Sequence, residues 1–205
     1  MPPIFIEYLK TQLNGELPGK VEHQKMLMSL KDGRKKFTRN PNTRKAAVLI
    51  LLYKLHEHWN FFLTKRSETV EHHKGQVSLP GGEIHKSESH WEAAQRETYE
   101  EIGVQNISYL GSLTPLLVPV SNFYIYPFVG WVKEKPTLKL NYSEVSKIFQ
   151  VSVKDFIKES ILMEKSEVIS QKVVKIPFFS LENEMVWGAT AALLNEFRYI
   201  LKRII

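Results

Sequence analysis

The feature that most constrains the fold is the run "AAVLILLYKL", from Ala46 to Leu55. The run is almost continuously apolar, so it predicts a strand that is deeply buried. The segment "NFFLTKR" follows after the short polar turn "HEHW", and its residue types suit a second strand. We therefore expect a β-hairpin in which one strand is deeply buried.

Helical and strand patterns surround this hairpin. Apolar residues at helical spacing and local capping signals predict helices at 5–13, 19–31, 89–102, near 153–160, and from 186 to the C-terminal end. Strand patterns occur at 106–118, 123–133 and 167–176, with a further short strand at 177–180. Together these elements predict an α/β fold, in which a mixed β-sheet has helices on both sides.

The positive charge of the chain is concentrated near its N-terminus. Residues 1–45 hold ten Lys or Arg against four Asp or Glu, so the net charge of +6 lies there. We expect residues 1–43 to form a basic helical arm that packs on one domain, residues 44–205. A basic arm suits an anionic partner such as a nucleotide. No nucleic-acid-binding motif accompanies the charge, so nucleic acid is not the expected partner.

The composition also limits the cellular context. Cysteine is absent, which fits a reducing compartment, and the N-terminal "MPPIFIEYLK" does not resemble a secretory signal. The sequence contains no run of 18 apolar residues that could cross a membrane. These features predict a soluble cytoplasmic protein, and they leave a homodimer open.

The predicted helix at 89–102 carries an unusual group of carboxylates. Each helical residue advances by about 100°, so Glu97, Glu100 and Glu101 fall within an arc of about 100°. Like charges at this spacing repel, and a hard divalent cation such as Mg²⁺ or Mn²⁺ would neutralise them. Mg²⁺ also binds phosphate oxygens, so the cluster points to a phosphorylated substrate. The alternative is a solvated acidic face without a ligand.

The residues around this cluster follow a longer pattern. It reads Gly, five residues, Glu, seven residues, Arg-Glu, two residues, Glu-Glu, one residue, Gly and an apolar residue. The matching residues are Gly82, Glu88, Arg96, Glu97, Glu100, Glu101, Gly103 and Val104. This pattern resembles the Nudix box, the signature of the Nudix hydrolases. One usually apolar position holds Thr98 instead.

The resemblance implies a Nudix α/β/α sandwich and a metal-dependent enzyme. Nudix hydrolases cleave the pyrophosphate of a nucleoside diphosphate linked to another group, using Mg²⁺ or Mn²⁺. The positions that match the metal ligands of the family are Glu97, Glu101, Glu100 and the carbonyl of Gly82. Arg96 and Glu88 match the ion pair that supports the motif, and they complete the expected catalytic set. The resemblance does not identify the general base, for which location suggests Glu144, Glu182 or Glu184.

The upstream segment "FLTKRSETVEHHKGQVSLPGG", Phe62 to Gly82, carries a second resemblance. It is similar to the signature of the coenzyme A pyrophosphatase branch, Leu-Leu-Thr-x-Arg-Ser/Ala, three residues, Arg, three residues, Gly, three residues, Phe-Pro-Gly-Gly. Phe62 and Leu79 are mild departures from it. Glu71 replaces an arginine and reverses the charge, which leaves the exact substrate open.

This second resemblance implies a substrate and the side chains that meet it. Coenzyme A carries a 3′-phosphate besides its pyrophosphate, and basic side chains should contact that charge. The expected substrate-binding residues are Arg66, Arg44, Lys65, His72, His73, Gly81 and Gly82. The expected reaction converts coenzyme A or an acyl-CoA into 3′,5′-ADP and (acyl-)4′-phosphopantetheine.

The sequence leaves three other functions open. Because Glu71 removes a cation, ADP-ribose or another nucleoside diphosphate sugar is an alternative substrate. A Nudix domain that senses a ligand without catalysis is a second alternative, but such domains usually have an eroded motif. A nucleic-acid-binding protein built on the basic arm is the third.

Overall fold

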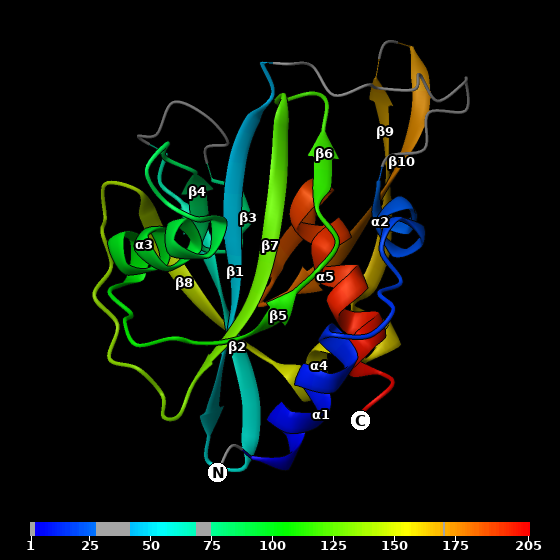
Figure 1. Ribbon diagram of the computed structural model, residues 1–205. Coiled ribbons are helices and arrows are strands. Elements are labelled where there is room, and N and C mark those ends of the chain that lie inside the picture. The colour runs from blue at the N-terminus through cyan, green and yellow to red at the C-terminus, as the bar shows by residue number, and fades with distance from the viewer. Residues whose placement is uncertain (1–2, 28–41, 69–74, 170) are drawn as a thin grey trace.

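The computed structural model describes residues 3–27, 42–68, 75–169 and 171–205. Its larger sheet has the strand order β3-β2-β1-β7-β5, with β4, β6 and β8 paired beside this path (Figure 1). The strands are β1 (Arg44–Leu55), β2 (His58–Arg66), β3 (Val77–Ser78), β4 (Gly81–Glu83), β5 (Ser108–Ser112), β6 (Leu116–Val118), β7 (Phe123–Val132) and β8 (Val145–Ser152). The sheet is mixed, because β1 runs parallel to β7 and antiparallel to β2.

Strand β1 lies at the centre of this sheet, and its apolar run contributes to two cores. Leu49 and Leu51 face one core, whereas Ile50 and Leu52 face the other, and all four are fully buried. This alternation follows from the period of two residues along a strand. The predicted hairpin is confirmed, because β1 pairs with β2 across a tight turn at His56, whose φ is +52°.

Helices cover both faces of the sheet, as the sequence predicts. Helix α3 (His90–Ile102) packs on the face of β1 that carries Leu49 and Leu51. Helix α5 (Gly188–Leu201) belongs to the core on the other face. The short helices α1 (Ile4–Leu13), α2 (Lys20–Met26) and α4 (Val153–Phe156) lie on that same side. Figure 1 shows these layers, with α3 at the left and α5 at the right of the sheet.

A second sheet corrects the expectation of one strand at 167–176. The chain instead reverses at Gln171, whose φ of +64° makes a tight turn, so that β9 (Leu162–Ile169) and β10 (Lys172–Leu181) form a hairpin. β11 (Glu184–Trp187) pairs with β10 to complete this sheet. The strand predicted at 106–118 is also two strands, β5 and β6, since Leu113 to Pro115 leave the extended pairing.

Helix α2 contacts α5 through a buried polar group. His23 Nε2 lies 2.7 Å from Glu196 Oε2, and both side chains are almost fully buried. The second predicted helix, 19–31, is observed only as α2, and residues 28–41 lie outside the described part. The division into an arm, 1–43, and a domain, 44–205, stays a prediction. Within the described residues, no helix is long and apolar enough to span a bilayer.

Candidate active site

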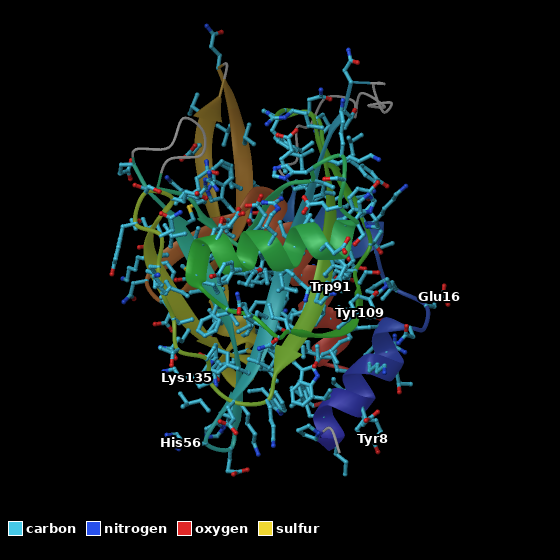
Figure 2. All side chains as sticks on the ribbon, turned by 60° about the vertical axis from the view of Figure 1, so that its left-hand side comes forward. Tyr8, Glu16, His56, Trp91, Tyr109 and Lys135 are labelled. Atoms are coloured by element: carbon cyan, nitrogen blue, oxygen red, sulfur yellow. The ribbon has the colours of Figure 1, made fainter. Side chains whose placement is uncertain are left out.

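Helix α3 begins and ends where the sequence predicts. The hydroxyl of Ser89 accepts a hydrogen bond from the backbone of Glu92, whose side chain accepts one in return. This capping box satisfies amide groups that the first turn leaves unpaired. Gly103 ends the helix with a φ of +77°. On the packing side of α3, the rings of Trp91 and Tyr109 of β5 meet edge to face, with their centroids 5.1 Å apart (Figure 2). This contact helps to fix the rotation of the helix about its axis.

Two glycines bring the backbone of β4 close to α3. β4 pairs with β1, so that Gly81 lies opposite Val48 and Gly82 opposite Ala47. A Cβ atom on Gly81 would lie 2.3 Å from the carbonyl oxygen of Ala47, and the φ of Gly81 is +149°. A Cβ atom on Gly82 would lie 2.4 Å from Oε2 of Glu97. Only glycine therefore allows the carboxylate of Glu97 to rest against this strand.

Arg96 links the acidic residues of the motif. Its guanidinium forms a forked pair with Glu88, with Nε and Nη2 donating at 3.0 and 2.8 Å. Nη1 donates to Glu97 at 2.7 Å and to Glu100 at 3.0 Å. Nη2 also donates to the backbone carbonyl of Glu83 at 3.0 Å, which joins α3 to β4. The Arg96 guanidinium lowers the pKa of Glu88 to about 2, and the carboxylates raise the pKa of Arg96.

The three glutamates differ sharply in exposure. Glu100 is 46% exposed, but Glu97 is only 13% exposed and Glu101 only 2% exposed. The solvated acidic face that the sequence left open is therefore wrong for Glu97 and Glu101. Burial raises the pKa of Glu97, although Arg96 opposes this effect. Burial raises the pKa of Glu101 to about 8, with the charges of Glu97 and Glu144 adding to the rise.

Glu101 has an incomplete set of partners. Its Oε1 lies 4.0 Å from Nη1 of Arg66, beyond hydrogen-bonding distance. Its Oε2 is buried and meets no hydrogen-bond donor among the described residues. Nε of Arg66 is also buried, and it meets no hydrogen-bond acceptor among those residues. An unsatisfied carboxylate oxygen in this position is costly, and it suits a site that binds a further group.

A fourth carboxylate comes from a distant part of the chain. Glu144 precedes β8, and its negative charge contributes to the raised pKa of both Glu97 and Glu101. The other two candidates for a general base lie elsewhere. Glu182 is exposed in the turn between β10 and β11, and Glu184 forms an ion pair with Lys65 at 2.9 Å. Position along the chain did not show which of these three residues is near the glutamates of α3. The pairing of β2 with β8 decides this, and of the three it brings only Glu144 to α3.

The structure separates the predicted substrate-binding residues. Arg66 faces α3, but Arg44 lies on the same side of β1 as Ile50 and Leu52, away from α3. The guanidinium of Arg44 pairs with Glu83 and covers the ring of Phe123. Lys65 likewise points toward β11 rather than toward α3. The alternation of side chains along each strand was visible in the sequence. The sequence did not show which face of the sheet packs against α3 and its glutamates. His72 and His73 lie outside the described residues, as does Glu71.

The donor set at α3 fits a hard divalent cation. Carboxylate oxygens from Glu97, Glu101 and Glu144 share one region, and the backbone of Gly82 lies against it. The unpaired Oε2 of Glu101 is the kind of oxygen that Mg²⁺ or Mn²⁺ binds. Within the described part of the chain, however, no three acidic or histidine side chains already form a metal-binding group. Arg96 holds Oε1 of Glu97 and Oε2 of Glu100.

Sequence comparisons find relatives of this chain among known proteins. The model of the NUDIX domain matches residues 43–172. Nudix hydrolase 3 of Caenorhabditis elegans is 29% identical over 169 residues, covering 73% of this chain and 70% of the relative. A NudL Nudix hydrolase of Pectobacterium atrosepticum is 31% identical over 156 residues, covering 75% of this chain and 80% of the relative.

Two solved structures support the same fold. The Nudix hydrolase RenU of M. smegmatis superposes with a TM-score of 0.56 at 14% identity, covering 88% of this chain and 95% of that one. An Ap4A hydrolase of C. elegans, solved as a binary complex, gives a TM-score of 0.52 at 19% identity, covering 78% and 98%. At these identities the likeness concerns the fold alone.

Proposed function

This chain belongs to the Nudix family and is a Nudix pyrophosphohydrolase, and from that premise we propose that it hydrolyses coenzyme A or an acyl-CoA. The products would be 3′,5′-ADP and (acyl-)4′-phosphopantetheine. The observation that carries the hydrolytic site is the buried carboxylate of Glu101, whose Oε2 meets no donor among the described residues. Glu97, which rests against Gly82, lies near this carboxylate. The choice of coenzyme A rests on the signature between Phe62 and Gly82, in which Arg66 lies 4.0 Å from the same carboxylate.

The proposed metal ligands are Glu97, Glu101 and the carbonyl of Gly82, with Glu100 as an additional one. Mg²⁺ or Mn²⁺ bound there would neutralise phosphate charge and lower the pKa of a water molecule. Arg96 holds the carboxylates in place, since it ties Glu97 to Glu88. Arg96 thereby helps to position the charged groups of the site, and such positioning is the main contribution a protein makes to phosphoryl transfer.

The remaining residues have roles in positioning the reactants and in proton transfer. A water oxygen forms a bond to phosphorus while the bridging P–O bond breaks, so that each product keeps one phosphate of the pyrophosphate. We assign the proton of that water to Glu144, the one base candidate of the three whose charge reaches Glu97 and Glu101. Arg66, beside Glu101, would contact phosphate oxygens of the pyrophosphate.

Hydrolysis of a substrate panel tests this function. Coenzyme A, dephospho-coenzyme A, ADP-ribose and a UDP-sugar would each be assayed with Mg²⁺, Mn²⁺ or EDTA. Preference for coenzyme A, lost in EDTA, would support the full proposal. Preference for ADP-ribose or the UDP-sugar would retain the pyrophosphatase chemistry and reject coenzyme A, as the charge reversal at Glu71 allows.

The position of Arg66 leads to a prediction about recognition of the 3′-phosphate. The sequence suggested a contact to that group, but the guanidinium lies beside Glu101. Arg66→Ala should therefore lower kcat/KM by about 10- to 100-fold, and by the same factor for coenzyme A and dephospho-coenzyme A. Arg44→Ala is the matched control and should change neither value by more than about twofold, because Arg44 lies on the other face of the sheet. If kcat/KM fell for coenzyme A alone, Arg66 would instead contact the 3′-phosphate.

A further inference from the structure

The segment between β7 and β8 covers the end of helix α3. The backbone N–H of Lys139 donates to the carbonyl of Ile102 at 2.9 Å, and that of Asn141 donates to the carbonyl of Glu101 at 3.0 Å. These carbonyls belong to the last turn, where a helix leaves its acceptors unpaired. Gly103 permits the contact, because a Cβ atom there would lie 2.8 Å from Cβ of Lys139. The segment is therefore fastened directly to the turn that carries Glu101.

The side chain of Asn141 organises the rest of this segment. Its Oδ1 accepts hydrogen bonds from the backbone N–H and the hydroxyl of Ser143, at 3.2 and 2.6 Å. Its carbonyl accepts from the backbone of Glu144 and Val145, at 3.0 and 2.9 Å. The resulting turn leads the chain, which has passed beside the end of α3, into β8. The side-chain amide Nδ2 is left to point toward Glu144.

Nδ2 of Asn141 donates to Oε1 of Glu144 at 3.1 Å. The backbone of Glu144 is held separately, since its carbonyl accepts from the N–H of Ser67 at the end of β2, at 2.8 Å. Three contacts therefore fix Glu144, two through its main chain and one through its carboxylate. Without the amide, the carboxylate could rotate away from Glu97 and Glu101 while the backbone stayed in place.

We propose that Asn141 is a positioning residue for hydrolysis, which orients the Glu144 carboxylate toward the glutamates of α3. This inference rests on the proposed function of Glu144. Asn141 couples the two parts of the site, because one residue binds both the carbonyl of Glu101 and the carboxylate of Glu144. Its amide supplies the donor, and an aspartate of the same shape would supply only acceptors.

The replacement Asn141→Asp tests the role of the amide. It keeps an acceptor for Ser143 and removes the donor to Glu144. We expect kcat to fall by about 10- to 100-fold, as for other residues that orient a catalytic group, while KM stays within about twofold. The rise in Tm on adding Mn²⁺ should persist, because Glu97 and Glu101 are unchanged. Tyr142→Ala is the matched control in the same segment, and kcat should not change, since this side chain is 74% exposed.

A double-mutant cycle separates orientation of Glu144 from a general effect on the fold. In a Glu144→Gln background, Asn141→Asp should cause no further loss of kcat beyond about twofold, because the two residues act as one unit. If the fold-losses in kcat of the two single variants multiply in the double variant, the proposal is overturned. A normal kcat in Asn141→Asp would also overturn it, and so would loss of the Mn²⁺-induced rise in Tm in that variant. Glu97→Gln, assayed in parallel, tests the underlying function: if it stays active, the proposed site itself is wrong.

Discussion

Glu101→Gln should abolish hydrolysis and at the same time stabilise the metal-free protein at neutral and alkaline pH. The loss of activity should be about 10²- to 10³-fold or more, as when one contact that stabilises a transition state is removed. The gain in stability follows from burial, because the carboxylate of Glu101 is 2% exposed and its Oε2 meets no donor among the described residues. Glutamine keeps the shape of the side chain without its charge.

The pH dependence of this effect has a definite sign. The pKa of Glu101 is raised to about 8 in the folded protein, so folding favours its protonated form. Stability from this group is complete below the ordinary glutamate pKa and is lost as pH rises toward 8. Between pH 5 and pH 8 the metal-free protein should lose on the order of 4 kcal/mol through Glu101. In Glu101→Gln this loss should disappear.

Thermal unfolding in EDTA at pH 5 and pH 8 measures the effect. The Tm of Glu101→Gln should exceed that of the unaltered protein by about 10 °C at pH 8, and by much less at pH 5. Glu134→Gln is the control, because this carboxylate is exposed and should shift neither value. Equal Tm values for Glu101→Gln and the unaltered protein at pH 8 would show that Glu101 is not strained by burial. Near-normal turnover of Glu101→Gln would remove it from the proposed metal site.

Arg96→Lys should destabilise the protein and inactivate it, although the charge is retained. The guanidinium of Arg96 makes a forked contact with Glu88 and also reaches Glu97 and the carbonyl of Glu83. An ammonium group is a single point and cannot span these acceptors. The side chains of Arg96 and Glu88 are 23% and 14% exposed, and contact with solvent weakens their interaction. We therefore expect the free energy of unfolding to fall by about 2–3 kcal/mol, which is below the range for fully buried pairs.

Denaturation by urea in EDTA would measure this loss, with Lys86→Ala as a control for an exposed cation in the adjacent loop. The pKa of Glu88 is lowered to about 2, so its contribution is present above the ordinary glutamate pKa and is lost as pH falls toward 2. The difference between Arg96→Lys and the unaltered protein should therefore shrink from pH 6 to pH 3. A constant difference would show that Arg96 stabilises the fold by packing rather than through Glu88.

Much of the fold could be predicted because its signals are local. The apolar run of β1, the capping box at Ser89 and the turn at Gly103 each occupy a few consecutive residues. The β9–β10 hairpin was missed because its turn at Gln171 contains no glycine or proline signal, although its φ is +64°. Strand β8 was not distinguished either, since its pairing partner, β2, lies about 80 residues earlier in the chain.

The sequence by itself indicated the family and the carboxylates of the candidate site. It also determined their common arc on α3, because a helix rotates by a constant angle for each residue. Only the tertiary structure decided their environment. Packing against β1 and β4 buried Glu101 and raised its pKa, and the pairing of β2 with β8 brought Glu144 and Asn141 to the end of α3. Strand alternation turned Arg66 toward the site and Arg44 away from it. Burial and electrostatic coupling depend on contacts between distant segments, which spacing along one segment does not specify.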